Sequence, residues 1–199
     1  MVSYRYYYFV PQLSGLAYGQ ALPMSSKAFR KKAASMMDGQ DAALLEKVNL
    51  DFGPGEKSGC GFIDGLREWE TALRLNLARL RAVKAGRDPD LQPAAPGFPQ
   101  SAVKAAARAV EADNPIEGEI IIDKARWEAV QEIQGSELFH RNTVFAHLMK
   151  LMILERQASF QAETGFSQYK SLYDSILEQY GASAGGASAD GASPMGESK

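Results

Sequence analysis

The stretch LREWETALRLNLARLRAV, residues 66–83, decides the fold of this chain of 199 residues. Its apolar side chains recur at alternating steps of three and four residues, which places them along one side of an α-helix. Arg67, Arg74 and Arg81 are spaced by seven residues on the opposite side. The stretch therefore predicts an amphipathic helix with a basic outer face. Its apolar positions are Leu66, Trp69, Leu73, Asn76 with Leu77, Leu80 and Val83.

Helical periodicity continues through most of the remaining chain. The one strand-like run, residues 4–10, is rich in tyrosine and could equally open the first helix. Because no partner strand accompanies it, we expect an all-α fold, an irregular bundle of about seven helices. The first expected helix begins at Ser25 or Ser26 and runs to about Met37, the second begins at a cap formed by Asp41, and the third is the stretch 66–83. Beyond them, helices are expected from Ser101 to about Asp113, from Asn114-Pro115 with Glu117 closing a capping box to about Ile133 before Gly135, from Asn142 to Thr164 and from Ser167 to Tyr180.

Proline and glycine divide the chain into an expected order of parts. Residues 86–100 contain Pro89, Pro93, Pro96 and Pro99 and read as an extended linker. The linker would separate an N-terminal helical half, residues 1–85 with the long basic helix, from a C-terminal helical half, residues 101–180. Residues 181–199 are mostly Gly, Ala and Ser, which predicts a disordered tail.

Composition excludes several classes of function. With 22 Lys and Arg against 24 Asp and Glu, the net charge of −2 argues against a nucleic-acid partner. The single cysteine, Cys60, leaves no internal disulfide and no multi-thiolate metal site. The sequence has no run of about 18 apolar residues, so no membrane-spanning helix is predicted. The N-terminus does not resemble a secretory signal. We therefore expect a cytoplasmic protein with no cofactor and no catalytic residues.

Two histidines keep a metal-dependent enzyme open as an alternative. His140 and His147 lie seven residues apart, and Glu137 and Glu155 are possible additional ligands. Metal ligands on one helix are usually three or four residues apart. A histidine in an apolar helix is more often a packing residue, so this reading ranks second. A self-associating helical scaffold is a third reading.

Charge is segregated along the chain. Residues 64–87 carry six basic and three acidic side chains, whereas residues 111–137 carry eight acidic and two basic ones. The arginine row formed by Arg67, Arg74 and Arg81 could pair with the protein's own acidic helix, with another subunit, or only with solvent. On the acidic segment, Glu117 and Glu128 are the residues we expect to meet a basic partner.

Three consecutive tyrosines, Tyr6, Tyr7 and Tyr8, cannot all point into one core. At least one ring is expected at the surface, where an amphipathic aromatic side chain suits a protein contact. The candidate partner-binding residues are therefore Tyr6, Tyr7, Tyr8, Arg67, Arg74, Arg81, Glu117 and Glu128.

Several blocks, in order over about residues 4–180, resemble a bacterial family of unknown function that is encoded in V-type (A/V-type) ATPase gene clusters. The blocks are Tyr6-Tyr7-Tyr8-Phe9-Val10 with Leu13, Trp69-Glu70 with Ala72-Leu73-Arg74 and residues 77–82, Asn114-Pro115-Ile116-Glu117 with Ile122-Asp123 and Arg126-Trp127, and residues 148–156 with Phe160, Glu163, Gly165 and Phe166.

This resemblance implies a non-catalytic structural or assembly subunit of a V-type ATPase. Size and helical character are similar to the C (or d) subunit, which couples the central stalk to the membrane ring. The implied partners are other ATPase subunits of the central stalk or the ring. The implied location is the cytoplasmic side of a membrane, reached through the ion-transporting complex and without a membrane span of the chain's own.

Overall fold

The computed structural model of the chain describes residues 6–52, 57–87 and 99–160, and these residues are helical without any strand. The expected all-α class is confirmed. Six α-helices are present in the described part, one fewer than expected, and the expected helix over residues 167–180 lies outside it, as do most of the linker and the tail. In chain order the helices are α1 (Ser26–Met36), α2 (Gly39–Leu45), α3 (Gly61–Lys84), α4 (Gln100–Glu111), α5 (Pro115–Gln134) and α6 (Arg141–Ser159).

Local signals set two of the helix starts as the sequence predicts. The Ser25 side chain accepts a hydrogen bond from the backbone N–H of Ala28 at 3.2 Å and caps α1. Asn114 caps α5 in the same way, accepting from the N–H of Glu117 at 2.8 Å, and Pro115 occupies the first turn. At Gly135, φ is +73°, a value that favours glycine, and α5 ends there.

Two predicted caps are wrong, each because the side chain has a tertiary partner. Asp41 lies inside α2, which begins at Gly39, and its carboxylate is buried against Tyr6 and Arg141. Ser101 lies inside α4, which begins at Gln100 after Pro99. Its hydroxyl accepts a hydrogen bond from the indole N–H of Trp69 on α3 at 3.0 Å.

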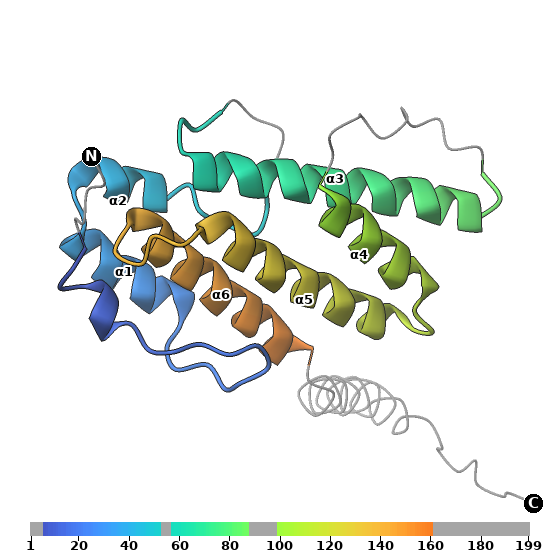
Figure 1. Cartoon of the computed structure of the whole chain (residues 1–199). Helices are drawn as coiled ribbons and strands as arrows, with labels where there is room; N and C mark the ends of the chain where they lie inside the picture. The colour runs from blue at the N-terminus through green and yellow to red at the C-terminus, as the bar shows by residue number, and fades with distance from the viewer. Residues whose placement is uncertain (1–5, 53–56, 88–98, 161–199) are drawn as a thin grey trace, which may run out of the picture. The chain divides into compact units, whose positions relative to one another are not determined.

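The apolar side of α3 packs on α4 and α5, as Figure 1 shows for its C-terminal half. Trp69, Leu73 and Leu77 are buried there against alanines of α4 and Ile122 of α5. The predicted stripe does not continue to the end of the helix, because Val83 is 57% exposed. Alanines on α4 let the two helices approach closely.

A second apolar cluster surrounds α6, which lies between α5 and the N-terminal helices (Figure 1). Phe145, Leu148 and Leu151 of α6 are fully buried there, together with Phe29 of α1 and Leu45 of α2. Glu155 ties α6 to the start of α1, accepting hydrogen bonds from Ser26 N–H at 2.7 Å and Ser26 O–H at 2.6 Å. Both clusters contain residues from the expected N-terminal and C-terminal halves.

The tyrosine-rich start of the chain is not a strand where it is described. Residues 6–9 form a turn and Val10–Gln12 a short 3₁₀-helix. The turn brings the chain end to the loop before α6, where Tyr6 N–H donates to the carbonyl of Phe139 at 3.3 Å.

None of the helices in the described residues combines the length and the hydropathy that crossing a membrane requires.

Candidate functional site

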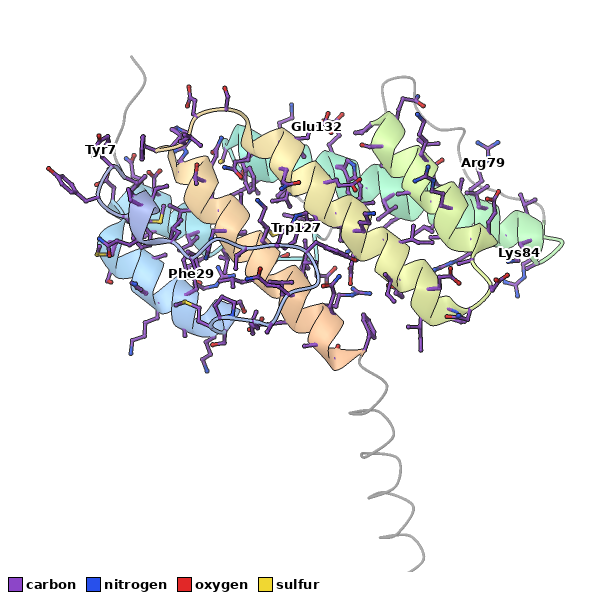
Figure 2. The ribbon with its side chains drawn as sticks, turned by 60° about the horizontal axis from the view of Figure 1, so that its bottom comes forward. Tyr7, Phe29, Arg79, Lys84, Trp127 and Glu132 are labelled. Carbon is purple, nitrogen blue, oxygen red and sulfur yellow. The ribbon has the colours of Figure 1, made fainter. Side chains whose placement is uncertain are left out.

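An aromatic surface forms where the start of the chain meets the loop before α6. We define it by Tyr7, Tyr8, Leu138 and Phe139. Tyr7 is 58% exposed, Tyr8 is 86% exposed and Leu138 is 63% exposed. The Tyr7 ring lies 4.7 Å from the Phe139 ring and 6.0 Å from the Tyr8 ring. Figure 2 places Tyr7 at one end of the described structure. The expectation that at least one of the three tyrosines is exposed is confirmed.

Tyr6, in contrast, is buried, and its side chain anchors the turn that carries Tyr7 and Tyr8. Its hydroxyl donates to Asp41 Oδ2 at 2.5 Å, and Arg141 binds Asp41 Oδ1 at 2.9 Å. Burial, followed by the hydrogen bond to Asp41, raises the pKa of Tyr6 well above its usual value. The hydrogen bond to Asp41 also raises the pKa of Arg141. Tyr6 therefore stays protonated and holds the turn in place, while its neighbours face solvent.

The arginine row finds acidic partners inside the chain. Arg67 lies 3.7 Å from Asp64, and Arg81 lies 4.0 Å from Glu119. Arg74 contacts Glu70 at 3.2 Å and Asp51 at 3.0 Å. Of the three arginines in the row, only Arg81 pairs with the acidic helix. These partners leave the row less available to an outside anion than its spacing suggested.

In the strongest ion pair between α3 and α5, each helix contributes a residue whose charge is opposite to the helix's net charge. Glu70, on the basic helix, accepts two hydrogen bonds from Arg126, on the acidic helix, at 3.0 and 2.6 Å. The Glu70 side chain is 4% exposed and that of Arg126 is 11% exposed. Two parallel N–H···O contacts between ionised groups are among the stronger hydrogen-bond arrangements in proteins.

Asp123 extends this network to α6. It accepts from Arg126 at 2.9 Å, and its other oxygen lies 3.4 Å from Arg156. Arg156 also pairs with Glu119. Burial raises the pKa of Asp123, and the two arginines act against that shift. A buried ion network of Glu70, Arg126 and Asp123 thus joins α3 to α5. Arg156 of α6 and Glu119, whose side chains are 33% and 30% exposed, extend this network towards the surface.

Sequence reasoning missed this network, although one signal was present. Glu70 lies three residues before Leu73 and seven before Leu77, which puts a charge on the buried side of the helix. An ionised group there needs a partner, because an unpaired buried charge is very costly. Nothing in the sequence identifies Arg126, 56 positions away, as that partner.

Glu117 and Glu128 are both exposed, as expected for residues that meet a partner. Glu117 contributes its backbone N–H to the Asn114 cap. Neither carboxylate forms an ion pair inside the described ranges. No pair between Arg74 and Glu128 is formed, since Arg74 is engaged by Glu70 and Asp51.

The two histidines lie in different surroundings, because His147 is buried and His140 is partly exposed. His147 is 8% exposed and its ring lies 4.7 Å from the Phe29 ring. Burial, helped by Lys150, lowers the pKa of His147 to about 4, so it is a neutral packing residue near pH 7. His140 lies in the turn before α6. Across residues 6–52, 57–87 and 99–160, no three His, Cys, Asp or Glu side chains gather as a metal site.

Comparison of the chain with protein-family models, with curated proteins and with solved structures finds no match.

Proposed function

We propose that this chain is a non-catalytic structural or assembly subunit of a V-type ATPase and acts through protein–protein contacts. The aromatic surface is the main contact in this proposal. The observation that carries it is the exposure of Tyr7, Tyr8 and Leu138 side by side with Phe139 at one end of a packed helical unit.

Exposed aromatic rings of this kind suit a protein interface. Tyrosine buries a large area on binding and keeps a hydroxyl for a polar partner. Single exposed apolar residues are common, but a contiguous group more often marks an interaction site. In this group, two tyrosines and a leucine are each more than half exposed. A partner that covered them would remove this apolar area from water.

The backbone that carries this surface is anchored to the helices. Tyr6, between the turn and α2, is fixed by Asp41, and Asp41 is fixed by Arg141 at the start of α6. The backbone bond from Tyr6 to Phe139 joins the two segments that carry the exposed rings. A contact surface ordered before binding loses less conformational entropy when the partner arrives.

The assignment to the ATPase rests on the resemblance. Many residues that carry it are structural here: Trp69 and Trp127 are buried, and Glu70, Asp123 and Arg126 form the buried ion network. Tyr7 and Tyr8 are among the residues of the resemblance that are exposed and contribute little to the core. Partner binding gives these two rings a role. The partners in this proposal are subunits of the central stalk or the membrane ring, as for a C/d-like subunit.

The test is co-purification of the tagged full chain with the V-type ATPase of the cells that contain it, in mild detergent. The Y7S/Y8S variant removes the two exposed rings, while L75S/V83S changes two comparably exposed apolar residues on α3 and serves as the matched control. We expect the wild type and the control to be recovered with the complex and the Y7S/Y8S variant to be recovered alone.

Two results would contradict the proposal at different points. Wild-type chain recovered alone, from preparations in which catalytic head and rotor remain assembled, would remove the ATPase assignment. Equal recovery of Y7S/Y8S and wild type would show that the aromatic surface is not the contact. Circular dichroism of the purified variants establishes that the helical content is unchanged.

A further inference from the structure

A groove runs between α4 and α5 on a part of the molecule that the proposed function does not use. Its volume is about 530 Å³. Three of the residues that line it are alanines: Ala105, Ala125 and Ala129. Lys104 and Arg108 of α4, and Lys124, Glu128 and Glu132 of α5, are the charged residues that line it. Figure 2 shows α4 and α5 next to each other, with Glu132 towards the C-terminal end of α5.

The charges of this groove differ from those of the buried ion network because they form no ion pair with any residue that the structure describes. All five side chains belong to exposed residues, and within the described chain none of them forms an ion pair. Five unpaired charges around one concave surface are a source of binding selectivity, since each is free to pair with a group on a partner.

The charges are ordered along the groove. A Cβ placed on Gly118 would lie 2.9 Å from the carbonyl oxygen of Ala109, so the end of α4 lies against the start of α5. The two helices are joined by a short turn and run in opposite directions. Arg108 is therefore at the turn end, Lys104 and Lys124 come next, and Glu128 and Glu132 follow at the far end.

We propose that the α4–α5 groove binds an amphipathic helix of a partner protein that is acidic at one end and basic at the other. The spacing of the lining residues supports a helix: positions 121, 124, 125, 128, 129 and 132 of α5 share one face, as do 101, 104, 105 and 108 of α4. The distance from residue 121 to residue 132 along α5 is about 16 Å, so the contact would occupy about three turns of the partner.

The floor and the ends of the groove favour this occupant over a nucleic acid. Alanine side chains are short enough for the backbone of a third helix to approach closely, with its apolar side chains between α4 and α5. A phosphate backbone would pair with Arg108, Lys104 and Lys124 but would be repelled by Glu128 and Glu132. A helix with segregated charges satisfies both ends.

The proposal is tested with two synthetic helical peptides of about 14 residues, a length near the minimum for an isolated helix. Both contain the same numbers of Ala, Leu, Glu and Lys. One has its glutamates in the first half and its lysines in the second, and the other alternates them. Fluorescence anisotropy with the full chain measures binding at low salt and at about 0.5 M salt, which screens exposed charges. We expect the segregated peptide to bind about tenfold more tightly than the alternating one at low salt.

Charge reversal provides the matched control. The K104E/R108E/K124E variant makes the groove acidic throughout and changes only exposed side chains. We expect it to bind the segregated peptide about tenfold more weakly and to bind an all-lysine peptide of the same length more tightly than wild type does. The Y7S/Y8S variant should bind the segregated peptide as wild type does, which separates this result from that for the aromatic surface.

Several results would overturn the proposal. These are equal affinity for the segregated and alternating peptides, no binding of either peptide, or unchanged affinity after charge reversal. Tighter binding of a single-stranded DNA oligonucleotide than of the segregated peptide would also overturn it and would identify the groove as a site for phosphates.

Discussion

Replacement of Arg126 by methionine tests the central claim about the core, that a buried ion network joins α3 to α5. The R126M substitution keeps a long side chain but removes the guanidinium that donates to Glu70 at 3.0 and 2.6 Å. It also removes the bond to Asp123 at 2.9 Å. Among the described residues, Glu70, which is 3% exposed, then keeps only Arg74 as an ion-pair partner at 3.2 Å, and Asp123 keeps only Arg156.

The expected loss of stability in R126M depends on the ion pairs that remain after the substitution. Removal of one partner of a buried ion pair generally costs about 3–5 kcal/mol, because it leaves an uncompensated buried charge. Here Arg74 and Arg156 partly neutralise the two carboxylates, so we expect the lower end, about 3 kcal/mol. For a chain of this length that corresponds to a decrease in Tm of about 6–12 °C. The double substitution E70L/R126M removes the stranded Glu70 charge as well and should cost less than R126M alone.

Urea unfolding followed by circular dichroism measures these changes as free energies of unfolding, with R79M as the control. Arg79 is an exposed arginine on α3 that forms no ion pair with any described residue, and its loss should change stability by less than about 0.5 kcal/mol. If R126M behaved like R79M, or if E70L/R126M were less stable than R126M, the reasoning about a buried network would be refuted.

Three further predictions follow from single contacts; they concern the pH dependence caused by His147 and the substitutions G118A and N114A. As the pH falls from 6.5 to about 4, unfolded His147 gains a proton that the folded form does not, so the free energy of unfolding should decrease in this window. Lowering the pKa of His147 from 6.5 to about 4 corresponds to roughly 3.4 kcal/mol. Urea titrations across this range should show the decrease, and H147F should reduce it. G118A places a Cβ 2.9 Å from the Ala109 carbonyl oxygen, so thermal unfolding should show a loss of about 1–3 kcal/mol. N114A removes the cap of α5 and should cost about 1 kcal/mol in the same assay.

The sequence predicts elements well where a local signal decides them. The three- and four-residue steps of α3 extend correctly over most of its length, and the Asn114-Pro115 start and Gly135 end of α5 are confirmed. These signals depend on residues within one or two turns of each other. Helix periodicity and caps are therefore read from the sequence without knowing the fold.

The wrong cap predictions occur where a polar side chain forms a hydrogen bond with a residue distant in the sequence instead of capping the nearby helix. Aspartate is a common N-terminal helix cap, which is the basis of the prediction for Asp41. In the structure, its carboxylate binds Tyr6, 35 residues away, and Arg141, 100 residues away. The Ser101 hydroxyl likewise accepts a hydrogen bond from Trp69, 32 residues away, instead of capping a helix. Such choices depend on the tertiary packing, which no local pattern contains.

The charge pattern shows why net charge alone did not locate the available surface. The basic surplus of residues 64–87 suggested α3 as the docking helix, but its row of Arg67, Arg74 and Arg81 is paired within the chain. The balanced α4–α5 face looks unremarkable by net charge, yet its lysines and glutamates lack partners among the described residues. An outside helix meets no competing ion pair at those residues, whereas at α3 it would first have to displace one. The faces available to a charged partner are therefore set by which charges the fold leaves unpaired, and among the described residues the groove between α4 and α5 is one such face.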